Sequence, residues 1–76
     1  MVPGADAVNK YKLLIVSAVG DRDGMALELA DVESGEQVAE VFVDARTQLR
    51  TVAFYTNRHV PFEVVEWLLS EATKRL

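Results

Sequence analysis

Residues 25–44 read MALELADVESGEQVAEVFVD, and this stretch decides the fold. Two runs rich in apolar residues, 25–32 and 37–44, lie on either side of the pair Ser34 and Gly35. This pair suits a two-residue hairpin turn, because glycine adopts positive φ without steric cost. The stretch therefore predicts two antiparallel strands joined by a tight turn.

A turn at Ser34 and Gly35 also fixes the expected pairing of the two strands. It sets Glu33 opposite Glu36, and the pairing then continues outward one residue at a time. The pairs expected farther from the turn are Asp31 with Val38, Leu29 with Glu40, and Leu27 with Phe42.

Two further strands flank this hairpin. The run YKLLIVSAV at 11–19 is dense in β-branched and apolar residues, and GDRDG at 20–24 has the composition of a turn. A polar connection at 45–50 leads to TVAFYT at 51–56, the fourth strand. Short connections favour an antiparallel meander, since parallel strands need crossovers of a dozen residues or more.

A helix is expected after the last strand. Pro61 suits the first helical turn, because its fixed φ matches the helix and its missing N–H has no partner to lose there. Apolar residues then recur at helical spacing up to about Arg75: Phe62, Val64, Val65, Leu68, Leu69, Ala72 and Leu76. We predict an α+β domain at 11–76, a four-stranded antiparallel β-meander followed by one C-terminal α-helix packed on one face of the sheet (ββββα). Residues 1–10 are predicted to form a flexible tail.

The composition narrows the functional classes. The chain of 76 residues has room for one domain, and it contains no cysteine, so it has neither disulfides nor thiolate metal sites. A net charge of −4 disfavours nucleic acid as a partner. No apolar run approaches the roughly 20 residues that cross a bilayer, and the first residues lack the pattern of a secretory signal. We therefore expect a cytoplasmic protein that binds neither membrane nor nucleic acid.

One helix is too narrow for the predicted sheet. A helix about 10 Å across covers part of a four-stranded sheet about 19 Å wide, and it covers one face. We expect the helix on the face that carries Leu13, Ile15, Leu27, Leu29, Phe42, Val52 and Phe54. The second face would then expose Leu14, Val16, Ala18, Ala26, Ala30, Ala39, Val41, Val43, Ala53 and Tyr55, interrupted by Lys12 and Glu28. Such an apolar face predicts an interface, either in a homodimer or with a different protein partner.

The residues predicted at this interface include one aromatic residue of the helix. Trp67 lies outside the apolar arc, and large aromatic residues are enriched at binding hot spots. In an alternative reading, Trp67 lies along the sheet edge with its N–H toward water. The predicted contact residues are Trp67, Tyr55, Val41, Val43, Leu14 and Val16.

A second candidate site precedes the helix. Arg58 and His59 lie close to its expected start, where free backbone N–H groups can hold an anion. The alternative is a solvated corner, since a lone histidine without a positioned acid or nucleophile makes no catalytic group. We find no catalytic, metal-binding or cofactor-binding signature and expect no enzyme activity.

The leading hypothesis is thus a small non-enzymatic protein-interaction or regulatory domain, homodimeric through an apolar sheet face. The alternative hypothesis is a small-ligand or anion-binding domain at the strand-helix junction, such as an accessory subunit of an enzyme.

Overall fold

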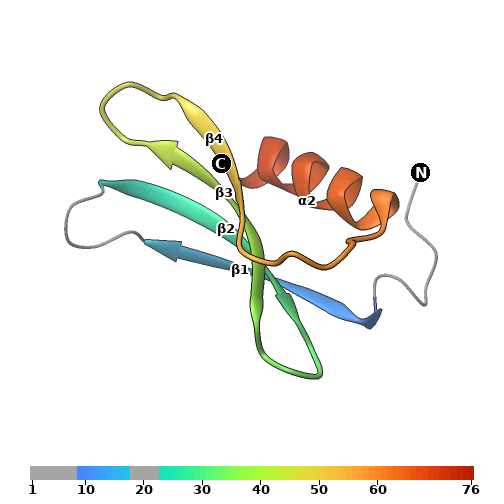
Figure 1. Cartoon of the computed structure of the whole chain (residues 1–76). Helices are drawn as coiled ribbons and strands as arrows, with labels where there is room; N and C mark the ends of the chain where they lie inside the picture. Colours follow the sequence, from blue (N-terminus) through green and yellow to red (C-terminus); the bar gives the residue numbers. More distant parts are fainter. Residues whose placement is uncertain (1–8, 18–22) are drawn as a thin grey trace.

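The computed structural model describes residues 9–17 and 23–76 (Figure 1). It contains a four-stranded antiparallel sheet with the strands in chain order, followed by a helix. The predicted α+β meander with a C-terminal helix is confirmed. Most of the predicted tail at 1–10 and of the predicted turn at 20–24 lies outside the described residues. The elements are β1 (Tyr11–Ser17), β2 (Gly24–Asp31), β3 (Gln37–Asp44), β4 (Arg50–Phe54) and α2 (Phe62–Arg75).

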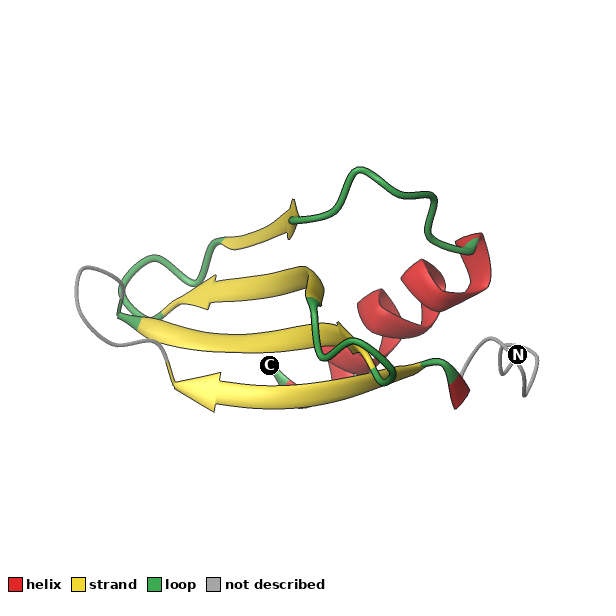
Figure 2. Cartoon of the chain, turned by 60° about the horizontal axis from the view of Figure 1, so that its bottom comes forward, coloured by secondary structure: helices red, strands yellow, loops and turns green. Residues whose placement is uncertain are grey.

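The helix α2 packs on one face of the sheet and reaches mainly the two central strands, β2 and β3. Figure 2 shows it toward one end of the sheet, while the β3–β4 hairpin extends beyond the helix. Its buried side chains are Val64, Leu68 and Ala72, which follow each other at helical spacing. The core consists of these three residues and Leu27, Leu29, Val38, Ala39 and Val41 of the sheet.

Charges at both ends stabilise α2. Pro61 is the N-cap residue, and its carbonyl oxygen accepts the N–H of Val64 at 3.0 Å. Glu63 lies in the first turn, where the helix dipole favours negative charge. In the last turn Arg75 forms an i, i+4 ion pair with Glu71 at 3.0 Å. Within the described residues, no helix has both the length and the apolar character to cross a membrane.

The pairing of β2 with β3 differs from the predicted pairing. Leu27 lies opposite Val41 instead of Phe42, and the register shifts between Leu29 and Ala30. Ala30 pairs with Gln37 and Leu29 with Ala39, so Val38 is the extra residue of a β-bulge. Both Val38 and Ala39 consequently lie in the core under α2.

The turn between these strands is also longer than predicted. Asp31 donates its N–H to the Glu36 carbonyl at 2.9 Å, which closes a four-residue loop, Val32–Gly35. The predicted two-residue turn is therefore wrong, although Gly35 does adopt positive φ, at 77°. A loop longer by two residues leaves every side chain on its expected face, because side chains alternate with a period of two. The one-residue bulge, in contrast, moves the β3 side chains beyond it to the side of the sheet opposite to the predicted one.

Both described hairpin loops are built around an aspartate. Oδ1 of Asp31 accepts the backbone N–H groups of Glu33 at 2.8 Å and Ser34 at 3.0 Å. The N–H of Gly35 donates to the Asp31 carbonyl at 2.8 Å. These bonds satisfy the loop backbone locally, as short polar side chains often do in turns.

The β3–β4 loop repeats this arrangement thirteen residues later. Oδ1 of Asp44 accepts the N–H groups of Arg46 at 2.8 Å and Thr47 at 3.1 Å, and Gln48 N–H donates to the Asp44 carbonyl at 2.8 Å. Gln48 takes the place of Gly35 and also has positive φ, at 63°. A residue with a Cβ is strained in this conformation, which glycine adopts freely.

This repeated loop geometry predicts opposite effects on stability for two substitutions. Gln48→Gly should raise the free energy of unfolding by about 0.5–1 kcal/mol, because it relieves the left-handed strain. Gly35→Ala should lower it by about 1 kcal/mol for backbone reasons alone, since a Cβ at Gly35 would meet no atom within 4 Å. Urea denaturation of both variants measures the difference. Equal signs for the two changes would contradict the shared loop geometry.

Two neighbouring leucines of α2 test the placement of the helix. Leu68 is fully buried whereas Leu69 is 42% exposed. Leu68→Ala should destabilise the domain by at least about 2 kcal/mol, because it leaves a cavity in the core. Leu69→Ala, the matched control with the same change of side chain, should cost less than about 1 kcal/mol. Similar losses in urea denaturation would show that α2 is rotated from the observed orientation.

Candidate interaction surface

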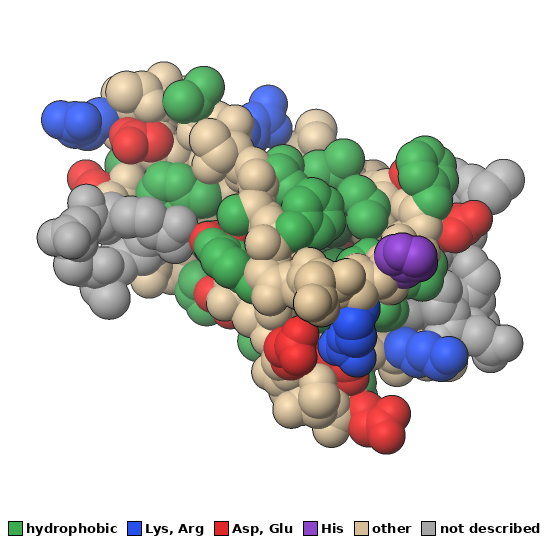
Figure 3. All heavy atoms as spheres, viewed as in Figure 1, with side chains coloured by type: hydrophobic (Ala, Val, Ile, Leu, Met, Phe, Trp, Pro, Cys, Tyr) green, Lys and Arg blue, Asp and Glu red, His purple; other side chains and the backbone are tan. Residues whose placement is uncertain are grey.

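Four large hydrophobic side chains remain exposed on β4 and α2. Their exposed fractions are 45% for Val52, 53% for Phe54, 70% for Phe62 and 42% for Leu69, and we call these four residues the apolar strip. Figure 3 shows hydrophobic side chains gathered between β4 and α2.

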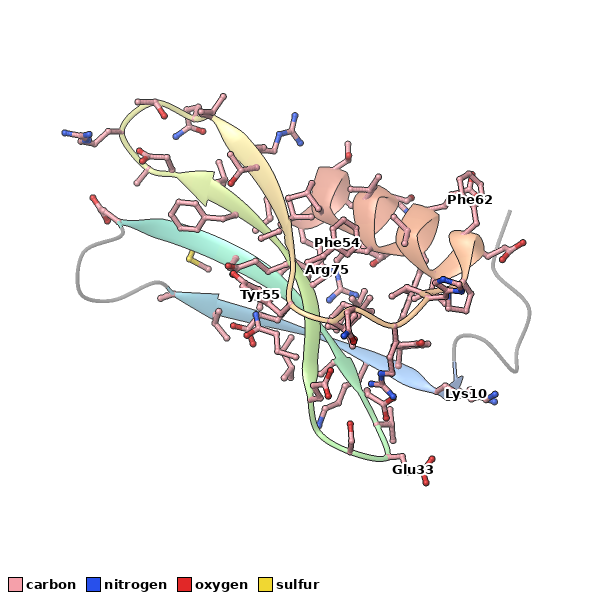
Figure 4. The ribbon with its side chains drawn as sticks, in the orientation of Figure 1. Lys10, Glu33, Phe54, Tyr55, Phe62 and Arg75 are labelled. Carbon is pink, nitrogen blue, oxygen red and sulfur yellow. The ribbon has the colours of Figure 1, made fainter. Side chains whose placement is uncertain are left out.

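The geometry of the two layers explains why the strip is uncovered. Val52 pairs with Val41 and Phe54 with Ala39, so both side chains lie on the helix side of the sheet. The helix reaches mainly β2 and β3, so β4 lies beside α2 instead of beneath it. Phe62 and Leu69 are seven residues apart, about two turns, and thus project from the same side of α2. In Figure 4 Phe54 lies on the side of β4 toward α2, and Tyr55 lies on the other side.

The opposite face of the sheet, which we call the back face, is less apolar than predicted. Because of the bulge, β3 presents Glu40 and Phe42 there instead of Val41 and Val43. The assignment of Val41 and Val43 to the uncovered face is therefore wrong, and Val41 is 3% exposed in the core under α2. The placement of Phe42 beneath the helix is wrong for the same reason.

A buried carboxylate lies within the back face. Glu40 is directly opposite Glu28 on β2 and is 3% exposed, and its carboxylate accepts a hydrogen bond from the Tyr55 hydroxyl. Buried carboxylates are costly unless they are hydrogen-bonded, so this bond stabilises the observed arrangement. The ring of Phe42 lies over Gly24, where a Cβ would come within 3.0 Å of the ring atom Cζ. The face on which the homodimer was predicted thus contains two carboxylates.

The other residues predicted at an interface lie in different surroundings. Trp67 is half-buried and packs against the core. Leu14 is 45% exposed and Val16 is half-buried, and both lie on the back face of β1. Tyr55 is 52% exposed although its hydroxyl is bonded to Glu40. The structure does not bring these residues together with Trp67 on one surface.

The junction before α2 carries the residues predicted to bind an anion. Arg58 and His59 line a cavity of about 60 Å³ together with Tyr11, Val38, Thr56 and Val60. The guanidinium of Arg58 lies 3.5 Å from Glu36 and 3.8 Å from Asp31, so two carboxylates already balance its charge. A cavity of this size has room for a few water molecules and is far below the usual 300 Å³ of a ligand pocket. The geometry disfavours an anion site here.

No group of three histidine, aspartate or glutamate side chains in the described ranges could hold a metal ion.

The sequence reasoning missed the apolar strip as a surface, since it placed Val52 and Phe54 beneath the helix. The widths of the helix and the sheet nevertheless indicated that such a surface would be left uncovered. A helix that covers two of four strands leaves the outer strands uncovered on its own side as well.

The aspartates of the two hairpin loops have lowered pKa values. The pKa of Asp31 is lowered mainly by the backbone N–H of Ser34, with further contributions from Glu33 N–H and Arg58, while desolvation opposes the shift. The pKa of Asp44 is lowered by the N–H groups of Thr47 and Arg46 in the same way. In both cases the ionised carboxylate is the form that holds the loop.

These shifts predict a loss of stability in acid. Because folding lowers both pKa values below the ordinary value of 3.8, the stabilisation is complete above that pH and disappears as the pH falls through the lower folded values. The double variant Asp31→Asn/Asp44→Asn keeps the accepting oxygens but cannot titrate there. Its melting temperature should fall less than that of the wild type as the pH is lowered below about 4. Parallel curves from pH 7 to 2.5 would refute the assignment.

Comparisons with known proteins assign this chain to no family. No protein-family model matches it, and neither a curated protein nor a solved structure is significantly similar to it. Inferences about its function therefore depend on the surfaces described above.

Proposed function

We propose that this chain is a small non-enzymatic protein-interaction domain whose contact surface is the apolar strip. The observation that supports the proposal is the exposure of Val52 and Phe54 on the helix side of the sheet, where residues of this kind are normally covered. Large contiguous exposed apolar patches are typical of interaction sites on soluble proteins. A strip that spans a strand and a neighbouring helix offers an exposed apolar surface for an apolar partner segment.

The energy available from the strip is sufficient for binding. Burying the exposed half of a Val, Leu or Phe side chain is worth about 1 kcal/mol. Four such side chains supply about 4 kcal/mol, which corresponds to about a thousandfold in affinity. The strip can thus contribute a central part of an interface, although polar contacts at the rim are needed for specificity.

The partner in this proposal is a protein, and the compartment expected from the sequence is the cytoplasm. Nucleic acid remains disfavoured by the net charge of −4. Self-association of the chain also stays a prediction, but the back face, with Glu28 and Glu40 opposite each other, is a weaker place for it than the sequence indicated. The proposed small-ligand function has no comparable support, because Arg58 is paired with carboxylates.

A photo-crosslinking experiment in the native cell tests the proposal. A benzophenone amino acid in place of Phe54 should give a covalent adduct with a protein partner, because the side chain lies within the strip. The same amino acid in place of Glu33, an exposed residue of the β2–β3 loop, is the control (Figure 4). Adding Leu69→Ser to the Phe54 probe should reduce the adduct by about tenfold, since it removes apolar contact area. Adducts no stronger than those of the Glu33 probe would contradict the proposal.

A further inference from the structure

The outer edge of β1 is unpaired within the part of the chain that the structure describes. β1 is the first strand of the sheet and pairs with β2 alone. Its sequence, YKLLIVS, contains four consecutive apolar residues, no proline and one charge, at Lys12. Leu14 and Ile15 are 45% and 44% exposed, on opposite sides of the strand. A long apolar edge with so little protection is a template for pairing with another strand.

One backbone hydrogen bond shows which groups point outward from this edge. Val32 donates its N–H to the Lys10 carbonyl at 3.0 Å, so Tyr11 and Asp31 form a pair without mutual backbone bonds. Because the two kinds of pair alternate along antiparallel strands, the same holds at every second residue of β1. The residues whose N–H and C=O groups face the open edge are therefore Tyr11, Leu13, Ile15 and Ser17.

We propose that a second copy of this chain pairs with this edge, antiparallel and about a two-fold axis at Leu14. This register is the one that overlaps all seven residues of β1, and it joins outward-facing residues to outward-facing residues. Tyr11 lies opposite Ser17 of the second copy, and Leu13 lies opposite Ile15. With two bonds for each of four pairs, the contact forms about eight backbone hydrogen bonds. The two sheets become one sheet with eight strands.

The strand is self-complementary in this register. Leu14 meets Leu14 of the second copy on the back face, and Leu13 meets Ile15 on the helix side. Lys12 lies opposite Val16, so the two lysines are four residues, or about 13 Å, apart along the strands. Over that distance salt screens most of their repulsion, since the Debye length is about 8–10 Å. A two-fold contact uses the same patch on both copies, as this strand does.

The other edge of the sheet is a poorer candidate. β4 has five residues, and the bond from Tyr55 N–H to the Val38 carbonyl shows that Arg50, Val52 and Phe54 face outward. A two-fold pairing of β4 would form three backbone-bonded residue pairs instead of four. It would also set each Arg50 opposite Phe54 of the second copy. Shortness is also one of the means by which natural sheets protect an edge.

This inference does not depend on the proposed function. β1 and β4 are opposite edges of the sheet, so the paired molecule would carry one apolar strip near each end. The two proposals can fail separately, because the crosslinking probe at Phe54 reports on the strip and not on β1.

A single introduced cysteine tests the register directly. The chain has no cysteine of its own, so any disulfide must come from the new residue. Across the two-fold axis the Cα atoms of Leu14 should be about 4.5 Å apart, within the range that a disulfide spans. Leu14→Cys should therefore form a disulfide-linked dimer at least about tenfold faster than the control Lys12→Cys, whose partner lies beyond reach. Equal rates for the two variants would overturn the proposed register.

Proline variants at the two edges test the contact without crosslinking. The N–H of Ile15 points outward, so Ile15→Pro removes a bond to the second copy and none to β2. Val52→Pro is the matched control, with an outward N–H on β4. By sedimentation at about 100 µM, the wild type and Val52→Pro should have twice the 8.4 kDa mass of one chain. Ile15→Pro should have the mass of a single chain. A monomeric wild type would overturn the proposal, and so would dissociation by Val52→Pro but not by Ile15→Pro. Should proline prevent folding, the cysteine rates decide.

Discussion

The packing of α2 onto two central strands is the constraint on which the rest of the structure depends. Val64 and Leu68 of the helix close the core over Leu27 and Leu29 of β2. A helix about 10 Å across spans two strands that are about 4.8 Å apart, so the outer strands receive little cover. The exposed residues of β4 and the open edge of β1 both follow from this mismatch between one helix and four strands.

The elements were predictable from the sequence because their signals are local. Apolar runs bounded by turn residues gave four strands, and helical spacing after Pro61 gave α2. The pairing was not predictable, because it depends on how Asp31 folds back over the N–H groups of Glu33 and Ser34 and on the bulge at Val38. Neither feature leaves a periodic pattern in the sequence.

The same bulge limited the prediction of the interaction surface. Side-chain alternation assigned Val41 and Val43 to the uncovered face, and one extra residue in β3 reversed that assignment. Trp67, a predicted contact residue, is half-buried and packs against the core. The pairing of Arg58 with Asp31 and Glu36 needed the folded chain, since these residues are more than twenty positions apart.

The position of α2 after all four strands has a consequence for synthesis. The β2–β3 and β3–β4 hairpins each close a loop of four residues, so these strands are close in sequence and can pair early. Leu68 must instead join the same core as Leu29, which lies thirty-nine positions earlier in the chain. Because a nascent chain leaves the ribosome with its N-terminal part first, the strands emerge before the helix that covers them. During that interval the apolar face with Leu27 and Leu29 has no layer above it, and the nascent chain depends on the speed of translation to shorten this exposure.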